Sequence, residues 1–229
     1  MISVVIATSN HAQQLPDTLS ALVHATMGGL IAEVIVADAG SADGTLMIAD
    51  AMGAQIIPHV TGGRGAQLAT GAAAARSDWL LFLPPDAVLE HGWDDEVDSH
   101  LRRAGRTHGR IAAAFRFALD DPSPKARRAE FWTRLRYRLL GLPRSEQGLL
   151  ISRRLYQSLG GYQALPAMED IDLARRIGAE RIVVLKSAAL SSAESFESKP
   201  ALAASRRNLG ALFLSICRVP LRMLAKLYG

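Results

Sequence analysis

The chain has 229 residues, of which 49% are hydrophobic, and this favours one folded domain with a sizeable core over a disordered chain. Its single cysteine, Cys217, excludes an internal disulfide, and no uninterrupted apolar run of about 18 residues predicts a membrane-spanning helix. No signal peptide is expected either, because Met1 leads into an apolar segment without a basic region before it. Together these features predict a cytoplasmic protein.

The formal net charge of +4 is distributed unevenly along the chain. Residues 1–100 carry 2 basic and 12 acidic side chains, whereas residues 101–144 carry 12 basic and 3 acidic ones. An acidic N-terminal half is a poor surface for nucleic acid but suits phosphates that are bridged by a metal ion. We therefore expect no nucleic-acid partner. The basic middle leaves three readings open: an anionic lipid surface, an anionic substrate, or solvent alone.

The first 100 residues alternate between strand and helix patterns. Helix 14–25 has leucines at helical spacing with Pro16 near its start, and helix 63–76 is rich in alanine. This alternation predicts a parallel sheet with helices on both faces. Strands are predicted at 2–8, 33–38, 54–60 and 79–83, and helices at 14–25, 45–52 and 63–76.

The second half of the chain has a less regular pattern. The helix at 127–140 is basic, and its spacing places Phe131, Leu135 and Leu139 on one face. A strand and a helix are expected within 146–162, and a loop followed by a helix within 165–178. The other predicted elements are a helix at 95–104 and strands at 109–119 and 180–188.

Two acidic residues lie at or just after the ends of predicted strands. Asp38 ends the strand at 33–38, and Asp86 comes soon after the strand at 79–83. In open α/β sheets, ligands bind outside the carboxyl ends of the strands. Two carboxylates at such positions indicate a site for a nucleotide and a metal ion.

Four segments together resemble glycosyltransferase family 2 of the GT-A type, and most of all its small soluble members with a Met-Glu-Asp base motif. The resemblance covers about residues 2–185 and implies a GT-A fold, an α/β architecture with a Rossmann-like mixed sheet flanked by helices. We expect a GT-A domain at 1–200, followed by a segment at 201–229 that its own composition predicts to be basic, apolar and helical. The segments are VVIATSN (4–10), EVIVADAGSADGT (33–45), GRGAQLATGAAAARSDWLLFLPPDA (63–87) and EQGLLISRRLYQSLGGYQALPAMEDIDLARRI (146–177).

The resemblance implies a nucleotide-binding role for five residues. Thr8 would lie near the base and ribose, and Asp38 would hold the base, usually uracil, with Ser41 and Asp43 close by. A carboxylate at a strand end can accept hydrogen bonds from a base N–H or a ribose hydroxyl. The alternative is that Asp38 and Asp43 only build an Asx-type turn and cap the next helix. Arg64 would bind the diphosphate at a glycine-rich helix start, unless it is simply a surface arginine.

Asp86 takes the place of the last aspartate in the family's Asp-x-Asp metal motif. The first aspartate is missing, because the chain reads Pro84-Pro85-Asp86. One carboxylate can still hold Mg²⁺ or Mn²⁺ when diphosphate oxygens and water complete the coordination. The alternative for Asp86 is a capping role.

In Met168-Glu169-Asp170, the resemblance makes Asp170 the catalytic base. Inverting transfer needs one base that takes the proton of the acceptor hydroxyl, and no protein nucleophile. Glu169, Glu146 and Gln147 would lie on the acceptor side. The alternative for Glu169 and Asp170 is that they are first-turn acids that interact favourably with the helix dipole.

These assignments predict an inverting glycosyltransferase that moves a sugar from a nucleoside diphosphate sugar, with UDP-linked donors favoured, to a hydroxyl acceptor. The Gln-x-x-Arg-Trp motif of processive synthases is absent, which favours one sugar per encounter. Ala7 in place of a proline, His11 in place of a glutamate, and the missing metal-motif aspartate support a rival, a non-catalytic nucleotide-binding or scaffold protein. A nucleotidyltransferase ranks last, because no longer Gly-rich loop with Arg and Lys follows the first strand.

The segment 201–229 is apolar with interspersed basic residues, and two readings of it stay open. In the first reading it forms an in-plane helix on the inner face of the membrane, and the acceptor would then be lipid-linked. In the second reading it forms a helix that packs on the domain or on a second subunit in a homodimer.

Overall fold

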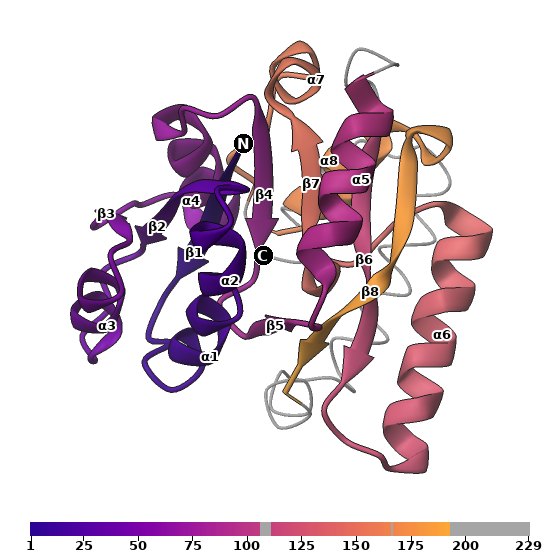
Figure 1. Cartoon of the computed structure of the whole chain (residues 1–229), viewed down its shortest axis with the longest axis horizontal. Coiled ribbons are helices and arrows are strands. Elements are labelled where there is room, and N and C mark those ends of the chain that lie inside the picture. Colours follow the sequence, from indigo (N-terminus) through magenta and orange to yellow (C-terminus); the bar gives the residue numbers. More distant parts are fainter. Residues whose placement is uncertain (106–110, 166, 193–229) are drawn as a thin grey trace.

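The computed structural model describes residues 1–105, 111–165 and 167–192. Eight strands form one sheet in the order β3-β2-β1-β4-β7-β6-β8-β5 (Figure 1). The segment 201–229 and the two readings of it lie outside the described residues. The strands are β1 Ile2–Thr8, β2 Ile31–Asp38, β3 Gln55–Ile57, β4 Trp79–Leu83, β5 Ala87–Leu89, β6 Ala112–Leu119, β7 Leu149–Ser152 and β8 Ile182–Ser191.

The N-terminal half of the sheet is parallel, as the sequence predicts. Strand β1 pairs in parallel with both β2 and β4, and β2 pairs in parallel with β3. The carboxyl ends of these four strands therefore lie on one edge of the sheet. The register places Thr8 opposite Asp38, so two of the predicted site residues end neighbouring strands.

The other half of the sheet is mixed. Strand β7 runs antiparallel to both β4 and β6, β5 runs antiparallel to β8, and β6 and β8 are parallel. The strand–helix alternation of the first 100 residues carries no prediction for this half, because an apolar run does not encode the direction in which a strand enters the sheet. The mixed GT-A sheet implied by the family resemblance is confirmed.

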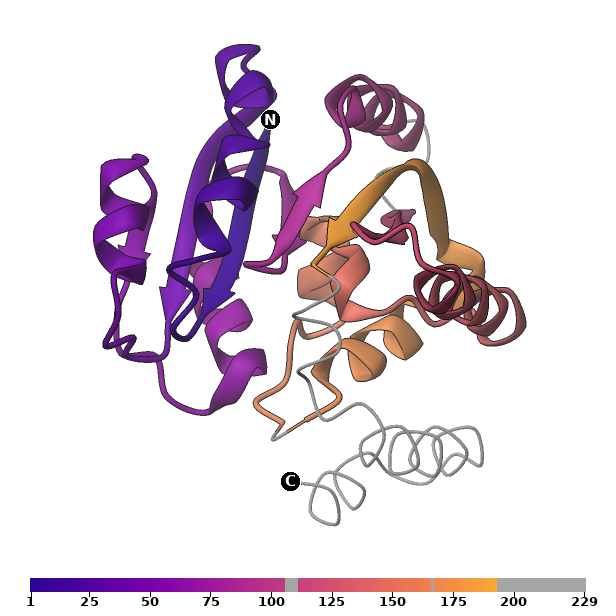
Figure 2. The same cartoon turned by 90° about the horizontal axis from the view of Figure 1, so that it is seen from below.

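Helices cover both faces of the sheet (Figures 1 and 2). Helices α1, α2, α3 and α5 contribute to the core on one face, and α4, α7 and α8 to the core on the other. Within the described residues, no helix is long and apolar enough to cross a bilayer. The helices are α1 Leu15–Ser20, α2 Val23–Met27, α3 Thr45–Ala51, α4 Gly63–Ala74, α5 Trp93–Gly105, α6 Pro124–Leu140, α7 Arg153–Ser158 and α8 Glu169–Ile177.

Most predicted elements are present with small shifts at their ends. The single helix expected at 14–25 is instead two short helices, α1 and α2. Strand β5 and the single-turn 3₁₀ helices Ser145–Gln147 and Ala179–Arg181 were not predicted. Each of these three elements has only three residues, which is too short to display a hydrophobic period.

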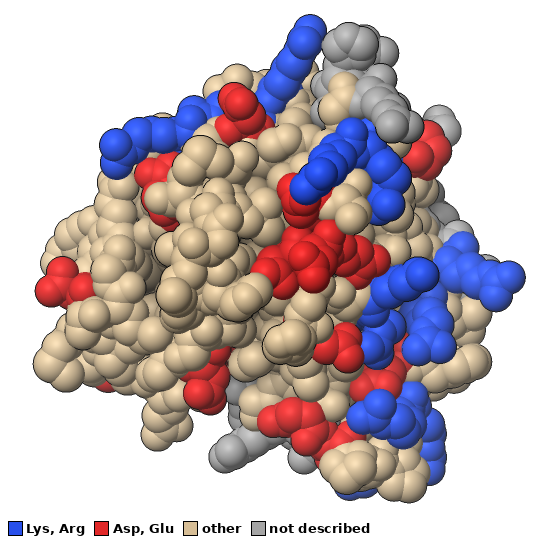
Figure 3. Space-filling view, viewed as in Figure 1, with Lys and Arg blue, Asp and Glu red and all other residues tan. Residues whose placement is uncertain are grey.

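Helix α6 starts at a Ser123 cap, whose hydroxyl accepts a hydrogen bond from the Ala126 N–H at 3.2 Å. The face that carries Phe131 is not the buried one, because Phe131 is 58% exposed. The helix instead buries Glu130 and Thr133, and the Glu130 carboxylate accepts a hydrogen bond from the Leu119 N–H of β6 at 2.9 Å. Basic side chains gather over α6, on the right of the molecule (Figure 3).

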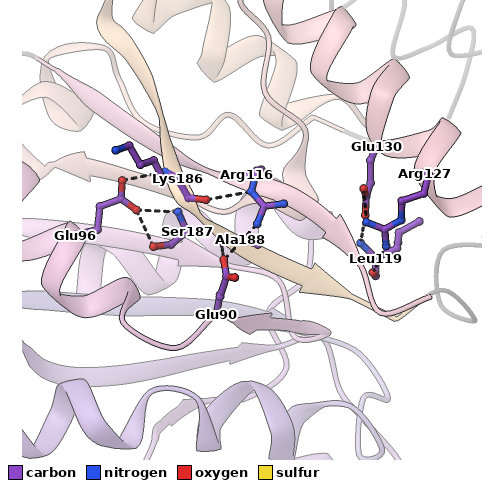
Figure 4. Close-up of polar contacts among 9 residues, drawn as sticks. All are labelled: Glu90, Glu96, Arg116, Leu119, Arg127, Glu130, Lys186, Ser187 and Ala188. Carbon is purple, nitrogen blue, oxygen red and sulfur yellow. Dashed lines mark hydrogen bonds and ion pairs between the residues drawn. The ribbon is translucent and has the colours of Figure 1, made fainter. Parts of the chain in front are cut away.

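Strand β8 is clamped by two carboxylates where its register with β6 shifts. The backbone N–H groups of Lys186 and Ser187 donate to Glu96 at 2.9 and 2.8 Å, and that of Ala188 donates to Glu90 at 2.8 Å (Figure 4). Burial alone would raise the pKa of Glu96, but these hydrogen bonds lower it below its usual value. The clamp therefore acts through the ionised carboxylate and fixes α5 to the far half of the sheet.

Helix α4 lies close against β1 because Gly71 has no side chain. A Cβ at Gly71 would lie 2.4 Å from the Val5 Cγ1 atom, and Val5 is completely buried. The Gln67 Nε2 group of the same helix donates two hydrogen bonds, to the carbonyls of Thr8 and Ala37, at 2.7 and 2.8 Å. The packing of α4 thus sets the position of the ends of β1 and β2.

We expect Gly71→Ala to destabilise the protein by about 1–3 kcal/mol, because the added methyl overpacks a buried contact and outweighs the better helix propensity of alanine. The measurement is urea unfolding. The matched control is Gly105→Ala at the end of α5, where a Cβ would meet nothing within 4 Å and the stability should not fall. Equal stabilities of the two variants would contradict this account of the α4–β1 contact.

Candidate active site

The ends of β1 and β2 meet at the Asp38 carboxylate, which is completely buried. Its Oδ1 accepts hydrogen bonds from the hydroxyls of Thr8, at 2.8 Å, and Ser41. Its Oδ2 accepts from the N–H groups of Gly40 and Ser41 at 2.7 and 2.6 Å. A carboxylate offers about four acceptor positions, so the hydrogen bonds from Thr8, Gly40 and Ser41 fill the acceptor positions of Asp38.

The Asp38 carboxylate is held in its ionised form. Burial favours the neutral acid, but the four hydrogen bonds from Ser41, Thr8 and Gly40 outweigh it and lower the pKa of Asp38. The turn after β2 is therefore organised around a buried negative charge. Asp38 and Thr8 lie together as the sequence predicts, with Ser41 as a shared neighbour.

Asp43 and Asn10 join the loop after β1 to the loop after β2. Asp43 accepts hydrogen bonds from the N–H groups of Thr45 and Ala12 at 3.0 and 3.1 Å. The Asn10 N–H donates to the Ser41 hydroxyl at 2.8 Å, and the Asn10 side-chain carbonyl accepts from the Ala42 N–H at 2.9 Å. Asp43 thus cross-links two loops, while the N-cap of α3 is Gly44, whose position has no side-chain cap.

Arg64 lies in the first turn of α4, and its Nη1 pairs with the Glu169 carboxylate of α8 at 2.8 Å. Glu169 is buried, so this ion pair joins the two helices at the site. The close approach depends on Gly65, because a Cβ there would lie 2.3 Å from the Gln163 carbonyl oxygen. The predicted phosphate-binding arginine is therefore a partly buried group paired with a residue predicted for the acceptor side.

Asp170 and Arg64 line the same recess. Burial, and then the neighbouring charge of Glu169, raise the pKa of the Asp170 carboxyl, while Arg64 acts in the opposite direction. A carboxyl with a raised pKa is suited to exchange a proton near neutral pH. The recess is lined by Arg64, Phe82, Pro143, Arg144, Ser145, Gly148, Leu149, Tyr162, Asp170 and Ala174.

The turn before β7 brings Glu146 and Gln147 near this recess without their lining it. Arg144 reaches both carboxylate oxygens of Glu146 at 3.2 Å, and Glu146 contributes to the raised pKa of Asp170. The Gln147 side chain bonds to the Phe115 carbonyl at 2.7 Å and to the Arg144 N–H at 2.9 Å. Gln147 thus holds the turn in place, and Arg144 and Ser145 of the turn line the recess.

Asp86 lies after β4 on the edge where β1 and β2 also end, and its side chain is buried. The loop before it is tied to α1 by the Thr18 hydroxyl, which donates to the Pro85 carbonyl at 2.9 Å. Among the described residues, no group of three or more His, Cys, Asp or Glu side chains could hold a metal ion. Asp86 is thus placed at the predicted edge without a set of further protein ligands around it.

Sequence reasoning missed three residues of this region: Tyr162, Arg144 and Arg136. Burial raises the pKa of the Tyr162 phenol, which leaves it a neutral wall of the recess. Arg144 had a local signal, a charged Arg-Ser-Glu run directly before a buried strand. Arg136 had no local sequence signal, because the buried face of its helix does not coincide with the helix's apolar residues.

The chain belongs to glycosyl transferase family 2, since the profile of the family described as "Glycosyl transferase family 2" matches residues 3–150. A curated relative from Rickettsia bellii (strain RML369-C), described as an uncharacterized glycosyltransferase, is 28% identical over 97 residues. That match covers 42% of this chain and 31% of the relative, so the chain spans about a third of the relative's length.

Solved structures share the fold. Glucosyl-3-phosphoglycerate synthase from Mycobacterium tuberculosis, in complex with Mn²⁺, UDP and phosphoglyceric acid, is 22% identical with a TM-score of 0.62, over 96% of this chain and 79% of that one. Mannosyl-3-phosphoglycerate synthase from Rubrobacter xylanophilus is 18% identical with a TM-score of 0.60, over 90% and 72% of the two chains. TarS 1–349 from S. aureus is 16% identical with a TM-score of 0.62, over 83% and 60%. These similarities establish the GT-A fold.

Proposed function

We propose that this chain is an inverting glycosyltransferase that moves a sugar from a nucleoside diphosphate sugar to a hydroxyl acceptor. The observation that carries the proposal is the recess shared by Arg64 and Asp170 in a chain of glycosyl transferase family 2. It holds a cation beside a helix N-terminus, suited to phosphate, and a carboxyl with a raised pKa, suited to proton transfer.

The nucleotide would bind along the carboxyl edge of β1 and β2. There Thr8, Ser41 and Asp43 hold the two loops, and Asp38 fixes the turn that presents backbone groups to the base and ribose. Arg64 would then face the diphosphate, which competes with Glu169 for its guanidinium. A UDP-linked donor is favoured, because UDP occupies a structural neighbour of this chain.

In the reaction, Asp170 takes the proton of the acceptor hydroxyl as the oxygen attacks the anomeric carbon of the sugar. The bond between that carbon and the diphosphate oxygen breaks, and the nucleoside diphosphate leaves with the electron pair from the opposite face. The new glycosidic bond therefore has the inverted configuration. Arg64 stabilises charge that develops on the leaving diphosphate.

A divalent metal fits this site when the diphosphate of the donor supplies part of its coordination. Carboxylate oxygen is a ligand type that Mg²⁺ and Mn²⁺ accept, and Asp86 offers it at the right edge of the sheet. Because no cluster of three protein ligands surrounds it among the described residues, diphosphate oxygens and water would complete the coordination. An ion held there by Asp86 would neutralise negative charge on the leaving diphosphate.

We expect UDP with Mn²⁺ to raise the melting temperature more than UDP alone, and more than GDP or dTDP with Mn²⁺. At about 100 times the dissociation constant the gain is roughly 2.7 kcal/mol, or about 5–10 °C for a domain of this size. Differential scanning fluorimetry makes the measurement.

Asp86→Asn should abolish the Mn²⁺-dependent part of the shift, whereas Asp95→Asn, at an exposed acid of α5, should leave it unchanged. The absence of a shift with every nucleotide, for folded protein, would favour a non-catalytic scaffold on the GT-A fold instead.

A further inference from the structure

Arg136 on α6 is a partly buried cation whose guanidinium is incompletely hydrogen-bonded. Its Nε and Nη2 atoms are shielded from solvent and have no hydrogen-bond partner among the described residues. The helix turn that carries it is anchored on both sides, by buried Thr133 and by the Tyr137 hydroxyl, which donates to the Ile182 carbonyl at 2.7 Å. The guanidinium is therefore held in place rather than left to swing into solvent.

Charged groups from the turn before β7 and from α8 act on Arg136. Burial, and then the neighbouring Arg144, lower the pKa of Arg136, while Asp170 of α8 and Glu146 of the turn act in the opposite direction. Both oxygens of Glu146 are already engaged by Arg144. Arg136 and Arg144 thus both lie near the Glu146 carboxylate, which Arg144 already pairs, and two nitrogens of Arg136 lack a hydrogen-bond acceptor among the described residues.

The position of this pair separates it from the donor side. Arg64 comes from α4, which packs on β1 and β2, whereas Arg136 and Arg144 come from α6 and the following turn, which pack on β6 and β8. Arg64, Arg144 and Asp170 line one recess. In an inverting transfer the acceptor reaches the base from the side opposite the leaving diphosphate, so a diphosphate held by Arg64 would leave the side of Arg144 to the acceptor.

We propose that Arg136, together with Arg144, binds an anionic group of the acceptor, a phosphate or a carboxylate, and so holds the acceptor hydroxyl beside Asp170. The proposal rests on the proposed function above and narrows its acceptor to an anionic molecule. Guanidinium groups recognise both kinds of anion in bidentate geometry. Shielded guanidinium nitrogens without an acceptor are costly to the folded state, and an anionic ligand would supply the acceptors that these two nitrogens lack.

The test uses inorganic phosphate as the probe on the full chain, by melting temperature at constant ionic strength with chloride as the reference salt. At about ten times its dissociation constant, phosphate should raise the melting temperature by about 3–6 °C. The shift should add to that of saturating UDP with Mn²⁺, because the two ligands occupy different sides of the recess. Arg136→Met should lose the phosphate shift and keep the UDP shift.

Without any ligand, Arg136→Met should melt above the wild type, because it removes shielded guanidinium nitrogens that lack an acceptor. Arg134→Met and Arg138→Met are the matched controls, at exposed arginines of the same helix, and should change neither the melting temperature nor the phosphate shift.

Three results would overturn the proposal: no phosphate shift, a phosphate shift that saturating UDP abolishes, or an unliganded Arg136→Met protein that melts well below the controls. The second would assign the anion to the donor diphosphate, and the third would give Arg136 a structural role. If UDP fails to bind while the phosphate shift still depends on Arg136, the proposed function fails but the anion site stands.

Discussion

Asp170→Asn is expected to lower the rate of sugar transfer by about 10²- to 10⁴-fold, the usual contribution of a positioned general base. The amide keeps the size of the carboxyl but cannot accept the proton of the acceptor hydroxyl. Binding of UDP with Mn²⁺ should be unchanged, because the substitution leaves Arg64 and the nucleotide edge intact. The measurement is the release of UDP from the sugar nucleotide that stabilises the protein.

The same substitution should not weaken the fold. The pKa of Asp170 is raised, chiefly by burial and by Glu169, so its ionisation at neutral pH opposes folding. Removing the charge should leave the free energy of unfolding equal or higher at pH 7, and the difference from the wild type should shrink as the pH falls and the carboxyl becomes protonated. Asp172→Asn, at an ion pair with Arg176 on the same helix, is the control that keeps activity. Transfer by Asp170→Asn within tenfold of the wild type would mean that another group is the base.

Asp38→Asn is expected to destabilise the protein by about 2–5 kcal/mol and to abolish nucleotide binding. The asparagine amide presents donors to a site where Thr8, Gly40 and Ser41 already donate, and buried donors left without an acceptor are costly. Urea unfolding measures the first effect, and the thermal shift with UDP the second. Asp50→Asn, at an exposed acid of α3, should change neither.

The contribution of Asp38 to the stability of the folded protein should fall as the solution becomes strongly acidic. Its pKa in the folded protein is lowered, so the stabilisation is fully present above the unfolded-state pKa of about 3.9 and is lost as the pH falls through the lower folded-state pKa. The difference in stability between wild type and Asp38→Asn should therefore be constant from neutral pH to about pH 5 and narrow only in stronger acid. A difference that narrows between pH 8 and pH 6 would point to a different titrating group.

The sequence predicted the parallel half of the fold because its strands are continuous apolar runs that end in polar residues. In β1, β2 and β4 the run itself marks the strand, and Thr8, Asp38 and Asp86 mark the carboxyl edge. The direction of β7 was not predictable, since it depends on how α6 and the turn after it return the chain. The buried face of α6 could not be predicted from hydrophobic spacing, because it carries Glu130 and Thr133, and Glu130 bonds to the backbone of β6.

In the candidate site too, contacts within one sequence segment were predictable and contacts between distant segments were not. Residues within one segment, such as Asp38 and Ser41, were expected to lie together and do so. The pairing of Arg64 with Glu169 joins positions 105 residues apart, and no local pattern encodes it. The incomplete hydrogen bonding of Arg136 is visible only in three dimensions. Asp170 remains the predicted base.

The cross-linked loops after β1 and β2 bear on the entropy of ligand binding. Fixing the backbone of one residue costs about 1–2 kcal/mol in conformational entropy. Because Asn10, Ser41 and Asp43 hold these loops together in the unliganded protein, that loss is incurred during folding. A nucleotide that binds there meets a surface that is already ordered, so its contacts contribute to affinity without being offset by loop ordering.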